Sequence, residues 1–140
     1  MRAILLLALC VPLSGCMKNA DLAPLPPFTR VEVSGETPDF MFPRDAGHEK
    51  AAALRVFIDA QRFGWTRAFA VGFGPPSPAC YAHLHDGSRY VGYFAVGAGV
   101  LPGSDAFFQV RCGDVYARKR VTRAEANRFL DIIGEGGELR

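Results

Sequence analysis

The sequence lacks a strong charge of one sign. Its 140 residues carry 16 Lys and Arg against 14 Asp and Glu, which gives a formal net charge of +2. Domains that bind nucleic acid usually have a strongly basic face, so we expect no nucleic-acid partner. The sequence also has no G-x-S-x-G elbow, no H-E-x-x-H pair and no P-loop. We therefore expect a protein that is not an enzyme and that needs no cofactor.

An apolar run long enough to span a bilayer, about 20 residues, is missing as well. A shorter apolar run occupies residues 3–11, directly after Arg2. A positive residue, a short apolar run and then small residues are typical of an export signal. The signal ends on Leu13-Ser14-Gly15-Cys16. This segment resembles the lipobox of bacterial lipoproteins, which has an aliphatic residue, two small residues and the cysteine that receives the lipid.

The lipobox resemblance implies a cellular location. Residues 1–15 would be a signal peptide that is removed, and Cys16 would become a lipid-modified N-terminus in the periplasm. An Asp after the cysteine favours the inner membrane in such lipoproteins. Met17 stands there in this chain, so we expect the outer membrane. The alternative is a chance cysteine in an ordinary secretory signal.

The rest of the chain is long enough for one domain. Three prolines, at positions 24, 26 and 27, predict an extended Pro-rich tether over residues 16–27. We expect a globular domain at residues 28–134 and a flexible tail at residues 135–140.

Cysteine is scarce, with four in the chain. Cys10 would leave with the signal peptide and Cys16 would carry lipid, so Cys80 and Cys112 remain. In an oxidising compartment we expect these two to form a disulfide. It would close a loop of roughly 30 residues and stabilise the fold by about 3–4 kcal/mol. The alternative is a reactive thiol at Cys80 beside a histidine, His83 or His85.

Hydrophobic periodicity predicts an α+β domain. Alternating patterns indicate strands at 29–33, 65–73, 79–85, 88–96, 106–112 and 115–121. A helical stripe covers residues 46–63, and Thr122 with Glu125 forms a capping box for a second helix that ends at Gly134. The predicted order is β-α-β-β-β-β-β-α. We expect a mostly antiparallel sheet of five or six strands with both helices on one face.

The hairpin between residues 79 and 96 predicts a binding face. Taking Asp86-Gly87 as its turn gathers four side chains on one face: Tyr81, His83, His85 and Tyr90. The opposite face would carry Cys80, Ala82, Leu84, Val91, Tyr93 and Ala95. Apolar matching of the next strand puts Cys112 on the cysteine side, and Gln109 and Arg111 beside the tyrosines and histidines.

Two interpretations of that face are open. His83 and His85 could hold a metal together with a third ligand from His48, Asp86 or a loop. We expect no metal, and a surface that contacts another protein. The partner-binding residues would then be Tyr81, His83, His85, Tyr90 and Arg111, since aromatic and Arg side chains dominate binding energy at interfaces.

The overall plan of signal, lipobox, tether and one small disulfide-bearing domain resembles the immunity lipoproteins that neutralise antibacterial effectors in the periplasm. The resemblance implies an inhibitor that plugs the active cleft of its protein partner while a lipid holds it on the membrane. The alternatives are a structural or accessory lipoprotein of an envelope assembly, and a small metal-binding or hydrolytic protein.

Overall fold

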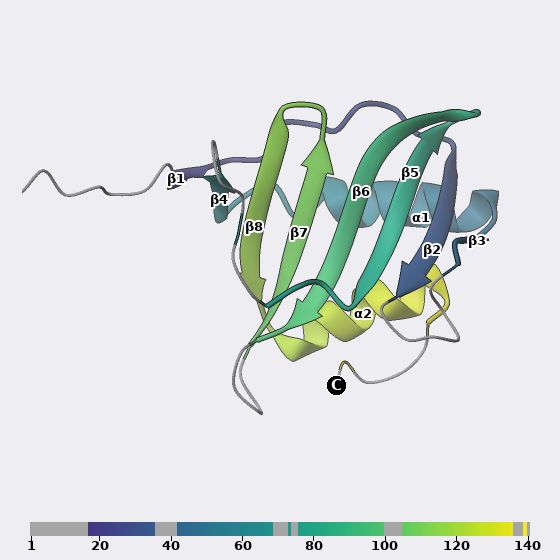
Figure 1. Ribbon diagram of the computed structural model, residues 1–140. Coiled ribbons are helices and arrows are strands. Elements are labelled where there is room, and N and C mark those ends of the chain that lie inside the picture. The colour runs from purple at the N-terminus through teal and green to yellow at the C-terminus, as the bar shows by residue number, and fades with distance from the viewer. Residues whose placement is uncertain are drawn as a thin grey trace, which may run out of the picture.

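The fold is an eight-stranded antiparallel sheet with two helices. The computed structural model describes residues 17–35, 42–68, 73, 76–99, 105–135 and 139. The strands lie in the order β1-β4-β8-β7-β6-β5-β2-β3, and both helices lie behind the sheet in the view of Figure 1. The strands are β1 (Met17–Ala20), β2 (Arg30–Gly35), β3 (Arg44–Asp45), β4 (Trp65–Ala68), β5 (Cys80–Asp86), β6 (Arg89–Ala98), β7 (Ala106–Cys112) and β8 (Val115–Val121). The helices are α1 (His48–Asp59) and α2 (Arg123–Ile133).

The predicted fold class is confirmed. The six expected strands and both helices occur in the expected order, and every strand pair is antiparallel. The structure adds β1 and β3 at the two edges of the sheet. In the part of the chain that the structure describes, neither helix is long and apolar enough to cross a membrane.

The ends of the two helices differ in how well the sequence predicts them. At α2 the capping box is present, with the Glu125 amide donating to the Thr122 hydroxyl, and Gly134 closes the helix with a φ of 82°. Helix α1 is shorter than expected. Gly47 precedes its first residue with a φ of 87°, and Ala60 follows its last residue, three residues before the expected end at residue 63.

The core lies between the sheet and the helices. Phe94 and Phe108 project from β6 and β7, with ring centroids 5.1 Å apart, and Phe129 of α2 lies 5.5 Å from Phe94. Phe57 of α1 completes this aromatic cluster, 5.6 Å from Phe108. The helices therefore bury one face of the sheet and leave the other to solvent and to loops. We call that second surface the open face.

The predicted tether is wrong for residues 17–27. Strand β1 pairs with β4, and Leu22 and Leu25 are each only 6% exposed. The Arg55 guanidinium donates to the Leu25 carbonyl oxygen at 3.1 Å and to the Pro26 carbonyl oxygen at 3.0 Å. The prolines do favour an extended chain, but Leu22 and Leu25 gain free energy by burial, so the segment packs against the domain.

The far end of the chain also departs from the expected free tail. Leu139 is 6% exposed. Its amide donates to Asn127 Oδ1 at 3.4 Å, and Arg123 donates to its carbonyl oxygen. Burial of one leucine ties this end of the chain to α2.

The β5–β6 hairpin has a different register from the one predicted. Its turn residues are Gly87 and Ser88, because Asp86 pairs with Arg89. Gly87 has a φ of 60°, as the first central residue of a type II′ turn requires. Pairing then shifts by one residue, so that His85 opposes Tyr90 but Leu84 opposes Gly92.

This shift is a β-bulge at Val91, and it corrects the predicted faces. An extra residue resets the alternation of side chains along a strand. Tyr93 therefore pairs with His83, and Ala95 pairs with Tyr81. Both lie on the open face with their partners, whereas the sequence placed them on the cysteine side.

The predicted disulfide is wrong in this fold. Cys80 and Cys112 both lie on the core side and both are free thiols. Cys80 pairs with Val96, whereas Cys112 pairs with Gly92, four residues earlier on β6. Standard strand dimensions put their Cα atoms roughly 15 Å apart, and a disulfide needs less than about 7 Å. The prediction that both cysteines lie on the same side of the sheet was correct. Their different positions along the strands keep the two sulfur atoms apart.

Candidate functional site

The open face carries all the tyrosines of the chain. The sequence contains four, and the pairing registers place each of them on this face: Tyr81, Tyr90, Tyr93 and Tyr116. One row of paired residues crosses five strands, from β2 to β8, in the order Glu32, His83, Tyr93, Arg111 and Tyr116. This face points toward the viewer in Figure 1.

Aromatic contacts join these side chains into one surface. The Tyr81 ring stacks on His83 at 5.9 Å and meets the edge of Tyr93 at 5.3 Å. The Tyr90 ring packs edge-on against His85 at 5.4 Å. The Arg111 guanidinium lies 5.7 Å from the centre of the Tyr116 ring. Rings held against one another lose little further freedom when a partner binds them.

Gln109 holds the centre of the face. It is only 3% exposed, although it lies on the side away from the helices. Arg118 donates to its Oε1 from Nε at 3.1 Å and from Nη2 at 2.6 Å. Its amide nitrogen donates to the Tyr93 hydroxyl oxygen at 2.8 Å. A buried amide with three hydrogen bonds fixes the positions of the groups around it.

Arg118 is itself held between aromatic rings. Its guanidinium lies 4.2 Å from the centre of the Phe107 ring and 4.8 Å from that of Phe73, and it donates to the Pro76 carbonyl oxygen at 3.0 Å. Burial lowers the pKa of Arg118 below its ordinary value. Phe73 and Pro76 therefore cover one end of the open face.

The two histidines have separate partners. His83 Nε2 lies 2.7 Å from the Ser34 hydroxyl oxygen. Burial, together with the nearby His85, lowers the pKa of His83 below its ordinary 6.5, so its ring is neutral at neutral pH. His85 Nε2 lies 3.3 Å from Glu32 Oε2, and Arg30 also binds that carboxylate, at 2.6 Å.

No group of three metal-ligating side chains forms among the residues that the structure describes. His48, one of the third ligands that the sequence suggested, has its Nδ1 3.0 Å from the Thr29 carbonyl oxygen. Asp86 lies 3.3 Å from Arg89. Most polar groups of this face are bonded to one another, although the two ring nitrogens of His85 are buried without a hydrogen bond. What the face offers outward is aromatic rings, hydroxyls and guanidinium groups.

The five predicted partner-binding residues do share one face: Tyr81, His83, His85, Tyr90 and Arg111. The sequence missed Tyr93, because the bulge that turns it outward has no clear signal beyond Gly92. It also missed Tyr116, although the alternation of β8 would have placed it beside Arg111. Neither Gln109 nor Arg118 was assigned a structural role.

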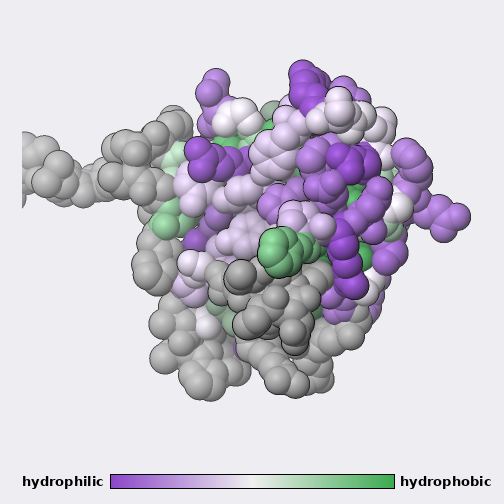
Figure 2. All heavy atoms as spheres, turned by 45° about the vertical axis from the view of Figure 1, so that its right-hand side comes forward, coloured by the Kyte–Doolittle hydropathy of each residue, from purple (hydrophilic) through white to green (hydrophobic). Residues whose placement is uncertain are grey.

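The surface around β2 and β3 is mostly hydrophilic. Figure 2 brings this side forward, and purple residues cover much of it, with one prominent green group between them and the grey atoms. The most exposed residue of the tyrosine cluster is Tyr90, at 53%. The open face therefore presents amphipathic rings with polar tips, which suit contacts that are part apolar and part polar.

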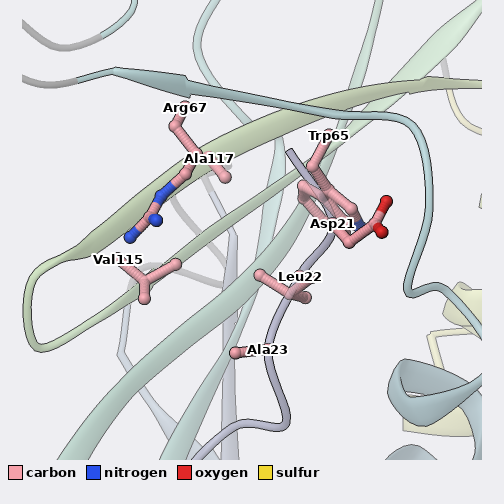
Figure 3. Close-up of a pocket in the computed structure, with 7 residues that line it drawn as sticks. All are labelled: Asp21, Leu22, Ala23, Trp65, Arg67, Val115 and Ala117. Atoms are coloured by element: carbon pink, nitrogen blue, oxygen red, sulfur yellow. The ribbon is translucent and has the colours of Figure 1, made fainter. Parts of the chain in front are cut away.

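A small hollow lies near β4, apart from this cluster. Its volume is about 40 Å³, room for roughly two or three water molecules. Figure 3 shows its lining side chains, which come from the segment after β1, from β4 and from β8: Asp21, Leu22, Ala23, Trp65, Arg67, Val115 and Ala117. Sites for small molecules usually measure about 300 Å³ or more, so we place the candidate site on the open face.

Comparison with known proteins assigns no family. No protein-family model, no curated protein and no solved structure matches this chain. The chemistry of the open face and the N-terminal sequence are therefore the basis on which we infer function.

Proposed function

We propose that this protein is a lipid-anchored periplasmic binding domain that inhibits another protein by covering its active cleft with the open face. The observation that carries the proposal is the gathering of all four tyrosines with His83, His85 and Arg111 on one sheet face. Tyr and Arg are the residues that most often anchor interfaces, and Tyr gives a large contact area at a low entropic cost.

Rigidity supports a steric mechanism. The bonded series Arg118, Gln109 and Tyr93 fixes the centre of the face before any partner arrives. A preformed surface avoids part of the ordering cost of association. An inhibitor of this kind needs no chemistry of its own, because occupying the cleft of an antibacterial effector or envelope enzyme excludes its substrate.

The proposed location in the periplasm rests on the lipobox-like segment that ends at Cys16. This segment lies outside the described residues. Two buried thiols would also be compatible with an oxidising compartment. Burial raises the pKa of Cys80 to about 12 and that of Cys112 to about 11. Because the thiolate is the reactive form, both would resist oxidation. An anchor on the outer membrane would keep the domain where incoming effectors arrive.

Site-specific photocrosslinking in cells tests the proposal. A photoreactive phenylalanine analogue would replace Tyr90 on the open face, and in a matched variant it would replace Val56, which is 72% exposed on α1. We expect a discrete protein adduct from position 90 and none from position 56. Adducts only from position 56, or the same adducts from both, would contradict a binding role for the open face.

A hydrolytic function is a second candidate, and one contact favours it. The Ser34 hydroxyl oxygen lies 2.7 Å from Nε2 of the neutral His83 ring, the separation expected between a nucleophile and its general base. A fluorophosphonate probe would label Ser34 if this pair were active, and His83→Gln would abolish the labelling. An unlabelled Ser34 in native protein would leave the contact as a structural hydrogen bond.

A further inference from the structure

The centre of the open face offers hydrogen-bond donors in a fixed direction. Arginine carries only donors, so the group of Gln109 that faces Arg118 must be its amide oxygen. The amide nitrogen therefore faces Tyr93 and donates to its hydroxyl oxygen at 2.8 Å. With that oxygen accepting, the Tyr93 O–H proton is directed onward, toward Tyr116 and the surface.

Tyr93 keeps its proton at neutral pH. Burial raises the pKa of its hydroxyl above the ordinary 10.0, against the hydrogen bond from Gln109, and interaction with Tyr116 raises it further. Arg111 stands between these two tyrosines in the register, paired with Tyr93 on β6 and with Tyr116 on β8. The row at this point consists of a guanidinium flanked by phenol hydroxyls, and the Arg111 N–H groups and the Tyr116 hydroxyl can donate to a partner.

Three carboxylates on and around the open face are already paired. Glu32 is bound by Arg30 at 2.6 Å and lies 3.3 Å from His85. Asp86 lies 3.3 Å from Arg89, and Asp105 lies 3.9 Å from Arg120. Among the residues that the structure describes, no carboxylate lies within ion-pair distance of Arg111. Its side chain is exposed, with the Tyr116 ring beneath it.

We infer that the protein partner inserts an acidic side chain, Asp or Glu, against Arg111 and Tyr116, with Tyr93 holding Tyr116 in place through its hydroxyl. A carboxylate has only acceptors, and it matches the planar fork of a guanidinium in a two-point contact. The aromatic rings around the contact exclude water and so strengthen it. The inference rests on the proposed function, because it names the chemistry of the partner that the open face would bind.

A peptide pair tests this chemistry without the natural partner. The full-length protein in detergent micelles would be titrated with a blocked peptide of alternating Gly and Glu, and in parallel with its Gly and Gln counterpart. The readout is the NMR signals of the arginine Nε–H groups. We expect saturable shifts at Arg111 with the Glu peptide and none with the Gln peptide. Equal shifts with both peptides would overturn the inference.

Variants separate a specific contact from general attraction between charges. Arg111→Gln should weaken binding of the Glu peptide by about tenfold or more, and Tyr93→Phe by a smaller factor. Arg120→Gln is the matched control, since it removes an equal charge from an exposed position of β8, and it should change affinity less than about twofold. If Arg111→Gln and Arg120→Gln weaken binding equally, the carboxylate contact is wrong.

The two proposals fail separately. Peptide binding at Arg111 without any photocrosslinked partner at position 90 would leave the acidic-group site standing and remove the proposed function. A crosslinked partner that binds Arg111→Gln as well as wild type would keep the function and overturn the carboxylate contact.

Discussion

Gln109 is the single residue on which the order of the open face depends most. Its amide oxygen accepts two hydrogen bonds from Arg118 and its nitrogen donates one to Tyr93. Because Gln109 is buried, water cannot replace these hydrogen bonds unless the side chains around it move. These hydrogen bonds therefore order the face, and Phe73 and Pro76 hold the Arg118 side chain that takes part in them.

Gln109→Ala should lower the free energy of unfolding by about 1–3 kcal/mol, the cost of leaving a buried polar group without its partner. Urea unfolding followed by circular dichroism measures this. Arg89→Ala is the control: its ion pair with Asp86 is exposed, so its loss should cost less than about 0.5 kcal/mol. Equal effects from the two variants would mean that the bonded series does not stabilise the fold.

His83 predicts a pH dependence of stability. Its pKa is lower in the folded protein than the ordinary 6.5, so the unfolded chain binds more protons. Stability should therefore be fully present above that ordinary value and should fall as pH drops toward the folded pKa. Unfolding curves at about pH 7.5 and about pH 5.5 measure the loss. His83→Gln should reduce the loss, and a variant with the same dependence as wild type would assign it to other groups.

At the scale of the element, the bulge in β6 decides which side chains reach the open face. Gly92 follows the bulged Val91 and has a φ of 153°. A Cβ there would collide with the Arg111 carbonyl oxygen and with Cys112. Glycine thus lets β7 approach closely at the point where the strand resets its alternation. The sequence predicted the hairpin but not the bulge, because a glycine within a strand does not by itself say which residue is unpaired.

Gly92→Ala should destabilise the fold by more than about 2 kcal/mol, since it adds a backbone clash to an unfavourable φ. Gly113→Ala is the matched control. Gly113 has a φ of 55° in the β7–β8 turn and nothing near its Cβ position, so only the conformational cost of about 1–2 kcal/mol applies. Thermal unfolding of the two variants measures the difference. A Gly92→Ala protein as stable as the Gly113→Ala protein would contradict the close approach.

The segment before β2, residues 17–27, is the one whose role we predicted wrongly from the sequence. The prolines correctly predicted an extended conformation. An extended conformation alone, however, does not distinguish a free tether from a segment that packs against the domain. Leu22 and Leu25 decide this, because both are buried against the core. Two leucines are too few to form a hydrophobic pattern that would predict burial in a proline-rich segment.

Leu22→Ala and Leu25→Ala should each lower the free energy of unfolding by about 2–4 kcal/mol, the usual cost of such a truncation in a core. Pro26→Ala, at the exposed position directly after Leu25, is the control and should have a small effect. Chemical denaturation of the three variants compares them. If the leucine variants unfold like wild type, the segment is a tether after all.

At the scale of the whole molecule, one sheet separates two roles. The helix side holds the aromatic core, and the open face holds the tyrosines, histidines and free Arg111. Binary patterning predicts this division, since alternation along a strand sends residues to opposite faces. It also predicted four of the five partner-binding residues as one group on β5 and β6. What it could not predict is distance along the strands, and for that reason Cys80 and Cys112 share a face without reaching each other.

The most direct test of the account is the affinity of the partner crosslinked at position 90 for variants of the open face. Calorimetry on the full-length protein would compare wild type, Tyr90→Ala, Arg111→Ala and Val56→Ala. We expect the first two variants to lose about 1–3 kcal/mol of binding free energy, as central anchors do. Val56→Ala, on the helix side, should bind like wild type. Normal binding by Tyr90→Ala and Arg111→Ala, with weakened binding by Val56→Ala, would contradict the assignment of function to the open face.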